Sequence, residues 1–128
     1  MVNIGGYVVV GEKGIVLEAN LPVRNRILKA MMDAKAAWAS ASFHCPDCIY
    51  EDVRREDLLA AYVAALEVVR ADPAYGLDGT RWAGGVTTRD VLLDVLPKHV
   101  KALKECEDEV LTIEDDFMMC DHTDLVGA

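Results

Sequence analysis

The sequence predicts a mainly α-helical fold, an antiparallel three- or four-helix bundle with a short β-hairpin at its N-terminus. Three stretches repeat apolar residues at spacings of three and four, the period of an amphipathic helix. Short or moderate connections join these stretches, which favours antiparallel neighbours. The chain has 128 residues, the size of one ordinary domain, so we expect a single helical domain over 1–128.

The hairpin is expected over residues 7–19. Two β-branched runs, 7–10 and 15–19, flank a turn of sequence Gly-Glu-Lys-Gly at 11–14. A lone hairpin is marginally stable in water, so we expect it to pack on another part of the protein.

The first two helices are expected over about 22–42 and 54–71. Pro22 occupies a position that the first helical turn tolerates. The first apolar stripe consists of Ile27, Met31, Ala34, Trp38 and Ala41, and the second of Leu59, Tyr62, Leu66 and Val69. Asp72-Pro73 ends the second helix, because the residue before proline disfavours helical geometry.

The third helix is expected to be the longest, over about 88–119, with a C-terminal tail at 120–128. Thr87 and Asp90 form a variant of the capping box at its start. A heptad-like pattern then continues through Leu92, Leu96, His99, Leu103, Cys106, Val110, Ile113 and Phe117. Pro97 predicts a kink or a break. On this stripe, His99 and Cys106 are expected to be core residues rather than a site.

The formal net charge of −9 comes from one C-terminal stretch. Residues 105–124 contain nine acidic residues and no Lys or Arg, whereas the rest of the chain contains 13 residues of each sign. Such a stretch repels phosphate, so we expect no direct nucleic-acid binding. It either forms solvated surface or attracts a basic protein partner. In the second case the candidate partner-binding residues are Glu107, Asp108, Glu114 and Asp115.

Four residues predict a zinc site. Cys45 and Cys48 have half of the spacing of a structural zinc site, and Cys120 with His122 can supply the other half. Thiolate and imidazole ligands suit zinc, and His44 is a reserve ligand. The segment 45–48, which we call the knuckle, follows one predicted helix, and Cys120 ends another, so both can meet at one pole of a bundle.

The same knuckle also has the form of a redox dithiol. Cys45-Pro46-Asp47-Cys48 resembles the C-P-x-C active site of glutaredoxins, although a predicted helix rather than a strand precedes it here. It also resembles the C-x-x-C motif of all-helical alkylhydroperoxidase-like proteins, which carry His four positions after the second Cys, where this chain has Asp52. In such a site Cys45 is the expected nucleophile.

Several kinds of site lack their motifs. No Glu-x-x-His of a di-iron bundle, phosphate-binding loop or EF-hand pattern is present. No apolar run reaches the ~18 residues of a membrane span, and the first residues do not have the pattern of a secretory signal. We therefore expect a cytoplasmic protein with reduced thiols.

These observations favour a small acidic interaction or structural protein, stabilised by the zinc site, over an enzyme. Two alternatives remain open. One is a dithiol redox protein that uses Cys45 and Cys48. The other is an acidic inhibitor in which the carboxylates of 105–124 imitate nucleic-acid phosphates and occupy the groove of a basic partner. If the protein is an interaction or structural protein, we expect a protein partner, and a homo-oligomer is compatible with this hypothesis.

Overall fold

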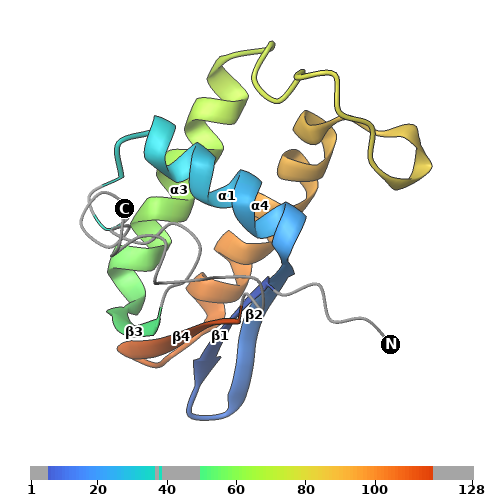
Figure 1. Cartoon of the computed structure of the whole chain (residues 1–128). Helices are drawn as coiled ribbons and strands as arrows, with labels where there is room; N and C mark the ends of the chain where they lie inside the picture. Colours follow the sequence, from blue (N-terminus) through green and yellow to red (C-terminus); the bar gives the residue numbers. More distant parts are fainter. Residues whose placement is uncertain (1–5, 37, 39–49, 117–128) are drawn as a thin grey trace, which may run out of the picture.

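The computed structural model describes residues 6–36, 38 and 50–116. Within this part of the chain, three helices lie on one side of a four-stranded antiparallel sheet (Figure 1). The strands are β1 (Gly6–Gly11), β2 (Gly14–Asn20), β3 (Tyr50–Arg54) and β4 (Val110–Asp116), in the order β2-β1-β4-β3. The helices are α1 (Leu21–Asp33), α3 (Arg55–Ala71) and α4 (Thr88–Glu105), and a 3₁₀ turn, η1, spans Ala83–Gly85.

The predicted helix bundle is therefore wrong, because the fold is a mixed α/β arrangement built on a sheet. The decisive difference is the segment after α4. That helix ends at Glu105, Cys106 adopts extended backbone geometry with φ −73° and ψ 137°, and the chain continues as β4 rather than as helix to 119. The hairpin expected over 7–19 corresponds to β1 and β2, but it belongs to this larger sheet.

The apolar period explains the misassigned strand. From Leu103 to Ile113 the spacing of apolar residues fits a helix, but Leu111 and Ile113 also fit alternation with a period of two. In the structure both are 1% exposed, whereas the side chain of Val110 is 53% exposed. Alternate burial is the pattern of a strand with one face on a core.

The first helix is also shorter than predicted. Asn20 caps α1 by accepting a hydrogen bond from the backbone N–H of Val23 at 3.1 Å. The helix ends at Asp33, and Lys35 then has a left-handed φ of 57°, which a helix cannot continue through. Within the described segments, no helix is both long and apolar enough to cross a bilayer.

The core lies between the sheet and the helices. Its sheet layer consists of Val9, Leu17, Val53, Leu111 and Ile113, all at most 5% exposed. The helical layer includes Ile27, Met31, Leu58, Tyr62, Leu96 and Leu103. Because side chains alternate along a strand, the residues between those of the sheet layer point away from the helices. The sheet thus has one buried face and one face turned outward.

Candidate functional site

The four predicted zinc ligands, Cys45, Cys48, Cys120 and His122, lie outside the described residues, as does the proposed redox pair. Among the residues that are described, no group of three or more His, Cys, Asp or Glu side chains is arranged to hold a metal ion. The described cysteine, Cys106, is half-buried, and its Sγ lies 3.8 Å from a carboxylate oxygen of Asp108.

The four predicted partner-binding residues have different environments. Glu107 is exposed in the connection between α4 and β4, and Glu114 is exposed on β4. Asp108 is half-buried and accepts a hydrogen bond from the backbone N–H of Glu12 at 3.0 Å. It therefore ties the α4–β4 connection to the turn of the hairpin. Asp115 pairs with Tyr7 in the sheet register.

The outward side of the sheet, which we call the open face, combines apolar and acidic side chains with Arg54, which is opposite Val110. Cross-strand partners point to the same side of a sheet, so the register defines this face. Val8 is opposite Glu18 on β2 and opposite Glu114 on β4, and Val10 is opposite Ile15 and Thr112. On β3, Asp52 is opposite Thr112, whose hydroxyl donates a hydrogen bond to it at 2.9 Å.

Two features distinguish the open face from ordinary strand surface. Ile15 is 63% exposed and Val110 53% exposed, so large apolar side chains lie in contact with solvent. The carboxylates of Glu18 and Glu114 have no ion-pair partner among the described residues. Both features are those of a surface that can bind a partner.

An acidic hollow lies beside the turn of the hairpin. It has a volume of about 630 Å³ and lies between the hairpin turn and the end of α4. Its acidic lining residues are Glu12, Glu105, Glu107 and Asp108, and its basic lining residue is Lys13. Ala102 and Glu105 of α4 line it as well, so most of the hollow lies on the helical side of the sheet. It meets the open face at exposed Ile15.

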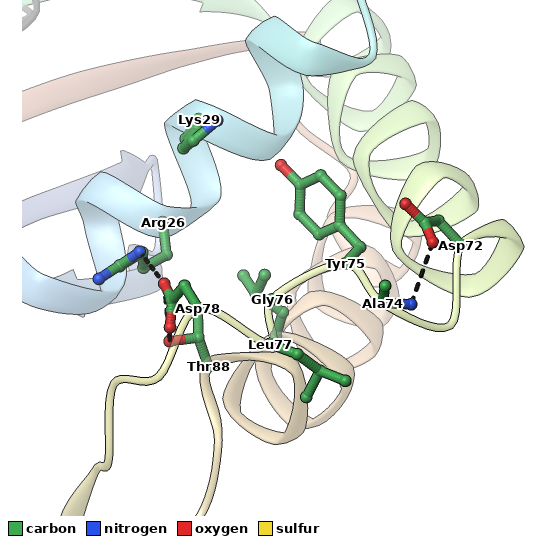
Figure 2. A pocket seen from close by; sticks show the side chains of 10 residues that line it. Arg26, Lys29, Asp72, Ala74, Tyr75, Gly76, Leu77, Asp78 and Thr88 are labelled. Atoms are coloured by element: carbon green, nitrogen blue, oxygen red, sulfur yellow. Dashed lines mark hydrogen bonds and ion pairs between the residues drawn. The ribbon is translucent and has the colours of Figure 1, made fainter.

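A second pocket lies at the opposite end of the helical layer, under the loop that joins α3 to α4 (Figure 2). Arg26 and Lys29 project into it from α1, and Tyr75 and Asp78 come from the loop. Its volume is about 270 Å³, slightly below the usual range for small-molecule sites.

The charged groups around this pocket are already paired with each other. Arg26 forms an ion pair with Asp78, and Lys29 forms one with Asp33 at 2.9 Å. The hydrogen bond from the Tyr75 hydroxyl holds the pKa of Asp33 below its usual value, and burial together with that bond raises the pKa of Tyr75. The backbone N–H of Thr80 lowers the pKa of Asp78. The ion pair between Arg26 and Asp78 anchors the loop on α1. The carboxylate of Asp72, which also lines the pocket, accepts a hydrogen bond from the backbone N–H of Ala74 at 3.0 Å.

A histidine links the helices to the sheet. His99 on α4 is 9% exposed, and its Nδ1 lies 3.0 Å from the hydroxyl of Tyr62 on α3. The two rings are edge-on, with centroids 5.3 Å apart. Burial lowers the pKa of His99 to about 4, while a hydrogen bond to the backbone of Glu18 acts in the opposite direction. The ring is thus neutral at pH 7 and is used for packing.

Comparisons of the chain with protein-family models, with curated proteins and with solved structures give no match.

Part of the open face is absent from the sequence-based predictions. Glu114 is among the predicted partner-binding residues. Glu18, Val8, Val10 and Ile15 are not, because the hairpin is expected to pack on a bundle. The signal was the alternation within the hairpin strands, which places Val8 and Val10 on the side opposite buried Val9.

Proposed function

We propose that this protein is a small acidic, non-enzymatic interaction protein that receives a basic protein partner on its open face and adjoining acidic hollow. The observation that carries the proposal is the pair Glu18 and Glu114. These exposed carboxylates flank Val8, and neither has an ion-pair partner among the described residues. Such charges attract cations over ~8 Å at physiological ionic strength, and nearby apolar side chains give a partner surface to bury.

The first test removes acidic charge that the fold does not use. Glu107→Gln combined with Glu114→Gln should weaken binding of an unstructured oligolysine peptide and flatten its dependence on salt. The melting temperature should change little, because exposed charges contribute little to stability. Asp108 is left intact because it accepts the hydrogen bond from the Glu12 backbone.

A matched control changes two exposed acids on the helices, Glu67→Gln with Asp94→Asn. This control has the same net charge as the test variant. A larger loss of peptide affinity in the test variant therefore shows binding at a specific surface rather than a general effect of net charge. Equal losses of affinity in the two variants, or binding that is indifferent to salt, would leave the acidic stretch as solvated surface.

Zinc stabilisation by Cys45, Cys48, Cys120 and His122 remains part of the proposal. The pairing of β3 with β4 supports it. Tyr50 is opposite Glu114, so β3 begins and β4 ends at the same end of the sheet. Since an extended chain covers about 3.3–3.6 Å per residue, the short links from Tyr50 back to Cys48 and from Asp116 on to Cys120 permit the thiols to meet.

Elemental analysis of native, unchelated protein tests the zinc proposal. We expect one zinc per chain, and Cys45→Ser or Cys120→Ser should release the metal and lower the melting temperature, since metal binding is coupled to folding. The chelated protein should keep its core, because the sheet and helices have an apolar core of their own. Zinc below about 0.1 per chain would contradict the proposal.

A further inference from the structure

The acidic residues of the open face lie on both sides of an apolar column. Val8 and Val10 on β1 form the column, and Ile15 continues it onto β2. Glu18 lies on one side of Val8 and Glu114 on the other. Resting on the proposed function, we infer that the partner presents a basic amphipathic helix that lies along β1, with Lys or Arg on both flanks of an apolar stripe.

The spacing of the two carboxylates fits a helix. Glu18 and Glu114 are both in register with Val8, on the strands to either side of β1. Two strand spacings separate them, which is about 10 Å. An α-helix with its side chains is roughly 10–12 Å across. Cations at the two edges of a helix over Val8 can therefore reach both carboxylates while its apolar stripe covers the column.

An extended segment does not satisfy the same arrangement. The side chains that a strand directs toward one surface stand in a single file, so they can follow the apolar column or approach one of the two carboxylates, but they cannot reach Glu18 and Glu114 on both flanks at once. A nucleic acid or an anionic membrane is disfavoured, because both would bring negative charge to Glu18 and Glu114. A helix with cationic side chains on both flanks of an apolar stripe can cover the apolar column and pair with both carboxylates.

The test uses three synthetic peptides and exchanges the charges across the interface. One peptide is an amphipathic helix with Lys on both flanks, the second is the same helix with Glu on both flanks, and the third is a scramble of the first. The protein variants are Glu18→Lys with Glu114→Lys, and a control of equal charge on the helices, Glu67→Lys with Asp94→Lys. Circular dichroism establishes that each variant is folded before affinities are measured.

The native protein should bind the Lys-flanked helix at least about tenfold more tightly than its scramble. Glu18→Lys with Glu114→Lys should lose that binding and gain the Glu-flanked helix, whereas the control should retain the preference of the native protein. Rescue by the reversed peptide is a result that a merely structural role for the two glutamates would not give.

The possible failures are distinguishable. If the scrambled peptide binds as tightly as the Lys-flanked helix, the surface recognises basic charge without requiring a helix. The inference of a helical partner is then wrong, and the proposed function is retained. If no Lys peptide binds the folded native protein, both the inference and the proposed function fail. If sedimentation shows a dimer that Glu18→Lys with Glu114→Lys converts to monomer, the open face is occupied by a second copy of the chain, and the inference is overturned.

Discussion

At the scale of single residues, His99 joins three elements through one ring. It belongs to α4, its Nδ1 lies 3.0 Å from the Tyr62 hydroxyl on α3, and it hydrogen bonds to the backbone of Glu18 on β2. In the neutral ring, one nitrogen accepts from Tyr62 while the other is left to donate to the carbonyl of Glu18. A second proton on the ring would compete with the Tyr62 hydrogen bond and would place a charge in the core.

Stability should therefore depend on pH through His99. The pKa of His99 is about 4 in the folded protein and about 6.5 in the unfolded chain, so the unfolded state binds more protons between these values. The free energy of unfolding should fall by up to about 3 kcal/mol as pH decreases from 6.5 toward 4. Denaturant unfolding at a series of pH values measures this slope.

His99→Gln provides the comparison, because glutamine can still accept from Tyr62 and donate to Glu18 but does not titrate. The slope between pH 6.5 and 5 should be much smaller in this variant. A slope equal to that of the native protein would show that the dependence arises from other groups. Asp33, Asp78 and Asp90 have lowered pKa values, so the stability that they contribute is lost at lower pH.

At the scale of elements, the boundary between α4 and β4 decides the fold. A period of three and four predicts that Val110 lies in the core, whereas the strand places it on the open face and buries Leu111. Leu111→Ala should cost about 2–5 kcal/mol, the usual loss for a large-to-small change in a packed core. Val110→Ala should cost less than about 1 kcal/mol, because the side chain is exposed.

Chemical denaturation of these two variants measures the difference. Leu103→Ala serves as a reference. Leu103 is buried on α4 in the structure, and the predicted helical stripe also places it in the core. Comparable costs for Val110→Ala and Leu111→Ala would contradict the strand.

Parts of the fold and of the site could be read from the sequence. The stripe of α3, the capping box of α4 and the hairpin turn are local signals, and the structure has a helix or a hairpin at each. The pairing of β1 with β4 could not be read, because a strand pattern does not say which distant strand is its neighbour. For the same reason Glu114 was recognised as part of an acidic stretch, but its position across Val8 from Glu18 was not.

At the scale of the whole molecule, the two sides of the sheet have different roles. The buried side carries the core with the three helices, and the open face carries apolar side chains between two acidic ones. An antiparallel sheet commonly has one solvated face, but that face is usually polar. Here β4 brings part of the acidic stretch into the sheet and places Glu114 beside the apolar column.

The most direct test of the account is amide chemical-shift mapping of the native protein as it is titrated with the Lys-flanked helical peptide. The account predicts that the largest shifts occur at the open face, at Val8, Val10, Glu18, Thr112 and Glu114, with α3 and the loop at 72–87 nearly unchanged. Shifts confined to the helices or to the pocket under that loop would contradict the claim that the open face is the binding surface.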